Sequence, residues 1–63
     1  MIKTKIRNTE TGVEKECDIL LKNDKILEVV LVNTTIKIFL KKYKNIYVGK
    51  YQNMEFTSSG NQI

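Results

Sequence analysis

The sequence predicts an all-β protein, a small antiparallel meander of about six short strands rolled into an SH3-like or similar small barrel. Apolar and polar residues alternate with a period of two in several segments, and short turn signals separate these segments. The 63-residue chain contains no alanine, the strongest helix former, and β-branched and aromatic residues dominate the alternating segments. A small sheet rolls up because strand twist accumulates and closure removes exposed edges.

The first predicted hairpin joins residues 2–7 to residues 13–21 through a turn that contains Gly12, a residue able to adopt positive φ. Pairing Asn8 with Val13 places three basic residues opposite three acidic ones on one face: Arg7 with Glu14, Lys5 with Glu16, and Lys3 with Asp18. This coincidence supports the register. It also decides between two interpretations of the basic residues Lys3, Lys5 and Arg7. A solvent-exposed face on which they pair with the opposite acidic residues is favoured over a row of phosphate-binding residues.

The next two turns extend an inner, core-facing side of the sheet. Residues 22–24 form a predicted three-residue loop, which places Cys17 opposite Val29 and Ile19 opposite Leu27. Residues 26–32 are apolar on both faces except at Glu28, as in a central strand that is covered on both sides. A two-residue loop at residues 33–34 then continues the inner face with three apolar pairs: Leu31 with Ile36, Val29 with Ile38, and Leu27 with Leu40.

The second half of the chain predicts two further turns, at residues 44–45 and 52–53, on either side of a strand at residues 46–51. The last turn pairs Tyr51 with Met54, and this sets Lys50 opposite Glu55 and Phe56 opposite Gly49. A helix competes for residues 36–43, whose apolar positions also fit one helix face, but the composition favours a strand. We expect one domain at residues 1–57 and a flexible tail at residues 58–63.

Composition argues against catalysis, metal binding and cofactor binding. The chain has no histidine, so the usual general base and zinc ligand is missing. Its single cysteine, Cys17, lies on the predicted inner face, where we expect it to be buried and inert. The sequence shows no signal-peptide pattern and no apolar run of membrane length. We therefore expect a cytoplasmic protein that is not an enzyme, does not bind membranes and takes no small-molecule substrate.

Protein–protein contact is the predicted function, because so small a core usually needs oligomerisation or a partner. The outward positions of the third to fifth strands are apolar to an unusual degree: Ile26, Val30, Val32, Phe39, Tyr43, Ile46 and Val48. Apolar patches rimmed by charge are typical of interaction surfaces. We expect Val30, Phe39, Tyr43 and Val48 to contact a protein partner or a second copy of the chain. Barrel curvature, the tail or a register slip offers the competing explanation, in which this face is covered.

The alternative function is single-stranded nucleic-acid binding by a small β-barrel. All of the net charge of +4 lies in residues 29–63. Five lysines there alternate with aromatic residues and are the candidate contacts: Lys37, Lys41, Lys42, Lys44 and Lys50. Basic residues that neutralise phosphates, together with rings that stack on bases, are typical of such proteins. The abundance of Lys, Asn and Ile, with no Pro or Trp, also indicates a phage or mobile-element accessory or inhibitor protein.

Overall fold

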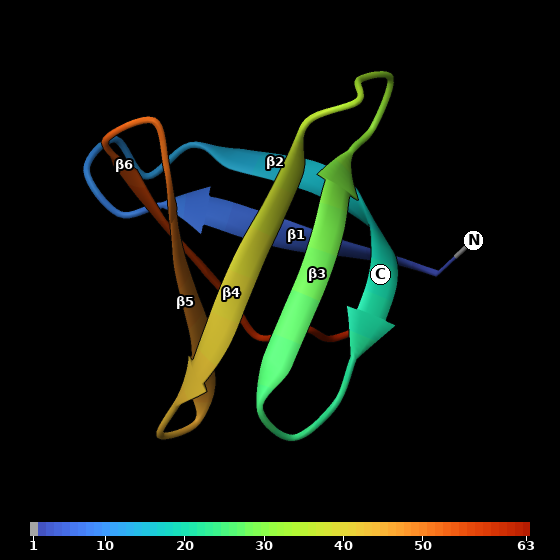
Figure 1. The fold of residues 1–63 in the computed structure, drawn as a ribbon. Coiled ribbons are helices and arrows are strands. Elements are labelled where there is room, and N and C mark those ends of the chain that lie inside the picture. The colour runs from blue at the N-terminus through green and yellow to red at the C-terminus, as the bar shows by residue number, and fades with distance from the viewer. Residues whose placement is uncertain (1) are drawn as a thin grey trace.

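The fold is a closed barrel of six antiparallel strands, seen in a computed structural model that describes residues 2–63 (Figure 1). The strands are β1 (Lys3–Asn8), β2 (Glu14–Lys22), β3 (Ile26–Leu31), β4 (Lys37–Tyr43), β5 (Ile46–Tyr51) and β6 (Met54–Ser58). Each strand pairs with the next, and β6 returns to pair with β1. The predicted small all-β barrel is therefore confirmed, and residues 37–43 form a strand rather than a helix.

The predicted registers hold across most of the barrel. In β1 and β2 the opposite charges face each other as expected, with Lys5 opposite Glu16 and Arg7 opposite Glu14. Leu27 pairs with Leu40 and Val29 with Ile38 between β3 and β4. Tight two-residue turns then set the last two hairpins, in which Tyr43 pairs with Ile46 and Tyr51 with Met54. Positive φ at Lys44, Gln52 and Asn53 supplies the backbone geometry of these turns.

The predicted register between β2 and β3 is wrong. Cys17 pairs with Leu31 and Ile19 with Val29, and a bulge between Ile19 and Leu21 shifts the pairing near the turn. The cause is the turn itself, where the Asn23 side chain accepts the N–H groups of Lys25 and Ile26 at 2.8 and 2.9 Å. The turn residues are thus 24 and 25 rather than 22–24. On the side of the bulge away from the turn, at Cys17 and Ile19, the predicted register is off by two residues. Because two is an even number, these side chains stay on their predicted face.

The core consists of inward-facing side chains from all six strands: Ile6, Cys17, Leu27, Val29, Ile38, Leu40, Tyr47 and Phe56. Tyr47 is the polar exception, and its hydroxyl donates a hydrogen bond to the carbonyl oxygen of Asn23 at 2.6 Å. Phe56 pairs with Gly49, as the sequence predicts. One closed interior therefore uses every inner face, and no outward side chain is needed to complete it.

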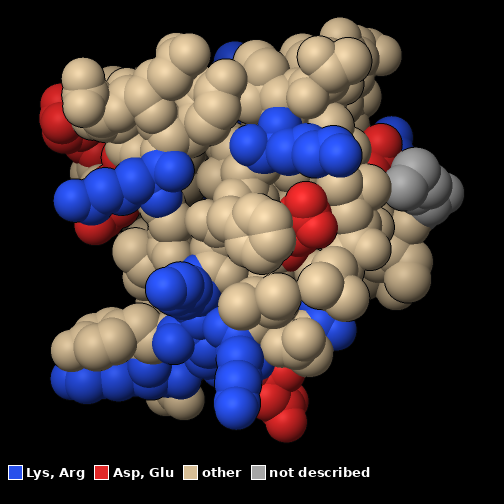
Figure 2. Space-filling view, in the orientation of Figure 1, with Lys and Arg blue, Asp and Glu red and all other residues tan. Residues whose placement is uncertain are grey.

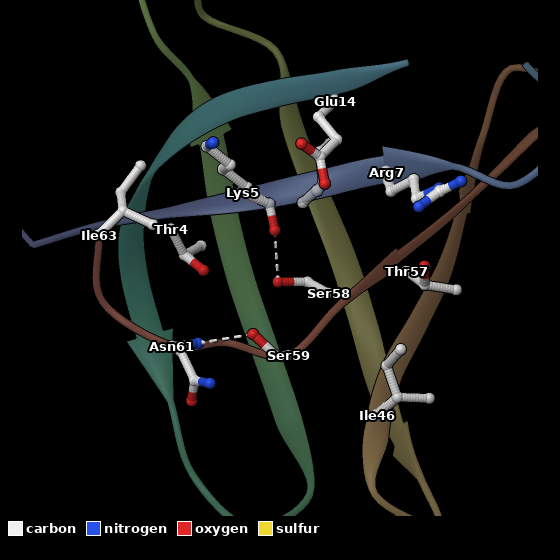
Figure 3. A pocket seen from close by; sticks show the side chains of 11 residues that line it. Thr4, Lys5, Arg7, Glu14, Ile46, Thr57, Ser58, Ser59, Asn61 and Ile63 are labelled. Carbon is white, nitrogen blue, oxygen red and sulfur yellow. Dashed lines mark hydrogen bonds between the residues drawn. The ribbon is translucent and has the colours of Figure 1, made fainter. Parts of the chain in front are cut away.

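Residues 58–63, predicted as a flexible tail, begin inside β6 and make specific contacts with β1 (Figure 3). The hydroxyl of Ser58 donates to the carbonyl oxygen of Lys5 at 2.7 Å, and the N–H of Ile63 donates to that of Lys3 at 2.9 Å. Gly60 is buried, and its carbonyl oxygen accepts a hydrogen bond from Lys22 Nζ at 3.0 Å. These contacts fasten the segment along the start of β1, and its flexibility stays a prediction.

Candidate interaction surface

The candidate site is the outer face of β3, β4 and β5, hereafter the outer face. It consists of the outward side chains of these strands: Ile26, Glu28, Val30, Lys37, Phe39, Lys41, Tyr43, Ile46, Val48 and Lys50. Successive side chains of a strand point to opposite faces, so burial of Ile38 and Leu40 forces Phe39 outward. Figure 2 has these strands in front and shows lysine side chains around an uncharged area with one acidic side chain beside it.

The four predicted contact residues all lie on this face. Phe39 is 56% exposed and Tyr43 is 64% exposed, although both belong to a regular strand. Val30 and Val48 are partly buried and stand opposite Lys37 and Lys41 in the register. Phe39 and the outward aliphatic side chains of β3 and β5 form an apolar surface that the core does not use, because the barrel interior is already filled.

Glu28, the one charged residue that the sequence places in an otherwise apolar strand, also lies on the outer face, and its partner there was not predicted. The register places it directly opposite Phe39, on the neighbouring strand. The correctly predicted pair of Leu27 and Leu40 already implies this pairing. On antiparallel strands, the residue after Leu27 must face the residue before Leu40. An acidic group therefore stands beside the exposed phenylalanine.

The structure divides the five predicted lysines into two sets. Lys37, Lys41 and Lys50 are exposed on the outer face. Lys42 instead lies with its Nζ 5.1 Å from the centroid of the Tyr47 ring, which points into the barrel. Lys44 belongs to the turn between β4 and β5, and its Nζ lies 5.5 Å from the centroid of the Tyr43 ring. A cation at this distance interacts favourably with an aromatic face, so Lys44 stabilises one anchor of the outer face.

A hollow of about 310 Å³ lies between β1 and residues 58–63 (Figure 3). The buried hydroxyl of Thr4 lines it and has no hydrogen-bond partner. Ser58 is already committed, because its hydroxyl donates to Lys5 and accepts from the N–H of Gly60. The hydroxyls of Thr57 and Ser59 and the side chains of Lys5 and Glu14 also line the hollow. Among the described residues, no hydrogen bond joins a hydroxyl of this hollow to the side chain of a base.

Cys17 is fully buried, as the sequence predicts. Burial, followed by the nearby charge of Asp18, raises the pKa of its thiol from 9.0 to about 11. Among residues 2–63, no group of three or more Cys, Asp or Glu side chains could hold a metal ion. A search of the same residues finds no helix with the length and apolar character needed to cross a membrane.

We expect Cys17 to react with a thiol reagent at pH 8 about 100-fold more slowly in the folded than in the urea-unfolded protein, because its thiolate fraction is lower and access is blocked.

Since the folded state keeps the thiol proton of Cys17 to higher pH, the stability contribution of Cys17 is intact below pH 9 and is lost as the pH rises from 9 to about 11. Kinetics with Ellman's reagent measure the reaction rate, and urea titrations at several pH values measure the stability. Cys17→Ala should lose less stability over this pH range, and rapid labelling of the folded protein would contradict the burial.

Comparisons of this chain with protein-family models, with curated proteins and with solved structures found no match. Evidence on function therefore comes from the geometry of the outer face and from the composition of the chain.

Proposed function

We propose that the protein is a non-enzymatic interaction module that binds a protein partner through the outer face, with Val30, Phe39, Tyr43 and Val48 as its main contacts. One observation carries the proposal: Phe39 is 56% exposed between two strand neighbours, Ile38 and Leu40, that are almost completely buried. Burying an exposed aromatic side chain of this size contributes about 1.5 to 3 kcal/mol. Aromatic side chains at the centre of a charged rim are where binding energy usually concentrates.

The chemistry around Phe39 favours protein over nucleic acid. Its apolar neighbours on the outer face are mostly aliphatic, and aliphatic side chains pack against other proteins but offer bases no stacking surface. Glu28 stands directly opposite Phe39, where its carboxylate would repel a phosphate backbone that passes over the ring. A protein partner can instead supply a cation or a hydrogen-bond donor to Glu28.

The proposal is tested by measuring whether association depends on the outer face. Wild-type protein, Phe39→Glu and Val13→Glu are each immobilised and exposed to extract of the source cells, and solution mass is measured in parallel. We expect a partner or a self-complex with wild-type protein and with Val13→Glu, since Val13 is exposed but lies outside the outer face. Loss of the complex with Phe39→Glu alone supports the proposal. Association that all three proteins share, or that none shows, overturns it.

Nucleic acid is the second candidate partner, and the order of residues along β4 favours it. Lys37, Phe39, Lys41 and Tyr43 alternate basic and aromatic side chains on one face, at a spacing of about 6 to 7 Å. A single strand could stack bases on the rings and place phosphates near the lysines.

If nucleic acid is the partner, we expect affinity for a mixed single-stranded oligonucleotide to fall steeply with salt, because phosphate contacts release counterions. Lys41→Glu should then weaken binding severalfold more than Lys42→Glu, since Lys41 lies on the outer face and Lys42 lies over Tyr47. Fluorescence anisotropy at several salt concentrations measures both effects. Absent or salt-independent binding removes this candidate.

We further propose that the protein acts in the cytoplasm as an accessory or inhibitor protein of a phage or mobile element. Its composition supports this proposal, with many Lys, Asn and Ile residues and neither proline nor tryptophan. A small barrel that presents an exposed apolar face is suited to inhibiting or redirecting another protein.

A further inference from the structure

We propose that the outer face binds a second copy of this chain, packed about a two-fold axis parallel to β4, so that Glu28 of each copy faces Lys50 of the other. This inference rests on the proposed function and names the partner of the same surface. It follows from the positions of the charges on either side of Phe39.

Opposite charges flank Phe39 across the sheet. On β3, Glu28 is its register partner. On β5, the pairing of Lys41 with Val48, continued by two residues along each strand, brings Lys50 level with Phe39. β5 remains close to β4 at this level, because an ideal Cβ on Gly49 would lie 3.0 Å from the Cα of Leu40. An acid, a phenyl ring and a base therefore run across the outer face in that order.

A two-fold axis parallel to β4 makes the outer faces of two copies complementary in charge. Rotation about such an axis lays β4 on β4 and places β3 of one copy against β5 of the other. The two Phe39 rings then meet at the centre, and Glu28 of each copy lies opposite Lys50 of the other, which gives two equivalent ion pairs. A two-fold axis that lies across the strands would instead bring Glu28 against Glu28. The charge pattern thus selects one orientation of the dimer.

Two like-charge contacts oppose this packing. Lys37 and Lys41 lie on β4 with Phe39, so each lies near its own copy across the axis, and their long stems must carry the ammonium groups sideways toward water. Glu55 is the register partner of Lys50 on β6, but its carboxylate accepts a hydrogen bond from the hydroxyl of Thr9 at 3.1 Å. This contact directs Glu55 toward the turn between β1 and β2.

Salt dependence separates a second copy from a nucleic acid or an acidic protein. Each outer face carries Lys37, Lys41 and Lys50 against Glu28, so two copies repel each other at long range. Added salt screens this repulsion and leaves apolar contacts in place, and it should therefore strengthen the dimer or leave it unchanged. Salt weakens a complex with nucleic acid or with an acidic protein.

Sedimentation equilibrium of the full chain and of charge-reversal variants tests the dimer. We expect Glu28→Lys and Lys50→Glu each to raise the dimer dissociation constant by about tenfold or more, because each variant places like charges together twice. An equimolar mixture of the two variants should form a heterodimer with a dissociation constant within about threefold of wild type, since both pairs are then attractive again. Glu14→Lys and Lys15→Glu carry the same charge changes on β2, outside the outer face, and should have no effect.

Each outcome of this experiment has a defined meaning. Recovery in the mixture, with intact dimers in both controls, supports the proposed axis. A wild-type protein that stays monomeric up to high micromolar concentration overturns the dimer but not the proposed function, which the capture experiment decides. A dimer that the mixture fails to restore overturns the pairing of Glu28 with Lys50. Oligonucleotide binding that weakens with salt and is lost in Lys50→Glu assigns the face to nucleic acid and overturns the inference.

Discussion

Replacing Gly49 with alanine is expected to lower the free energy of unfolding by about 3 kcal/mol, most of the stability of so small a domain. A Cβ atom at this position would overlap the carbonyl oxygen of Phe39 and lie 3.0 Å from both the Cα and the Cγ of Leu40. Two of these three atoms belong to the backbone, so β4 and β5 would have to separate to make room. Overpacking of a core costs about 1 to 3 kcal/mol and sometimes more, and a domain of this size is held by only about 3 to 5 kcal/mol.

Circular dichroism and urea titration at 25 °C measure this effect, and Gly12→Ala provides the matched control. Gly12 has a φ of 76°, so an alanine there adopts an unfavourable left-handed backbone, but a Cβ would meet only the end of the Arg7 side chain, 3.5 Å away. The control should lose only about 1 to 2 kcal/mol. A Gly49→Ala variant as stable as wild type would show that β5 does not approach β4 this closely in solution.

Replacing Phe39 with glutamate should abolish association while the barrel stays folded. The side chain is 56% exposed, so its loss removes little from the core. The new carboxylate would stand opposite Glu28 but between Lys37 and Lys41 along β4, so local repulsion and attraction offset each other. We expect the free energy of unfolding of the monomer to change by about 1 kcal/mol or less. Association should weaken by about thirtyfold or more, as for a central hot spot.

Sedimentation measures the association and urea titration the stability of the Phe39→Glu variant. Val13→Glu is the control, because Val13 is also half exposed but lies beside the turn between β1 and β2. It should change neither quantity appreciably. Unfolding of Phe39→Glu would mean that the ring belongs to the core, and undiminished association would move the contact surface elsewhere on the barrel.

Local sequence signals predicted most of the strand pairing because short turns determine register. The turns at residues 44–45 and 52–53 and the alternation on both sides of them gave the pairs of Tyr43 with Ile46 and of Lys50 with Glu55. The turn between β2 and β3 failed for a local reason: Asn23 accepts two backbone N–H groups and moves the turn toward Lys25. Sequence alone does not show which of several polar residues will cap a turn.

Alternation along the strands predicts the candidate site as a face, and its arrangement follows only when the strand register is added. The alternation along β4 was enough to place Phe39 and Tyr43 outward, since burial of their neighbours follows from the period of two. Grouping the lysines by composition joined Lys42 to Lys41, although the same alternation puts them on opposite sides of the strand. The alternation along β4 separates Lys41 from Lys42, and the predicted register also implies that Glu28 lies opposite Phe39.

The sequence by itself determined the strand class, most turns and the two faces of each strand, because these depend on residues that are neighbours along the chain. The tertiary structure decided the closure of β6 on β1, the attachment of Ile63 to Lys3 and the close approach of Gly49 to β4. These features join backbone segments through the curvature of the whole barrel. Alternation defines which side of a strand faces inward, but only the closed barrel shows which atoms then come into contact.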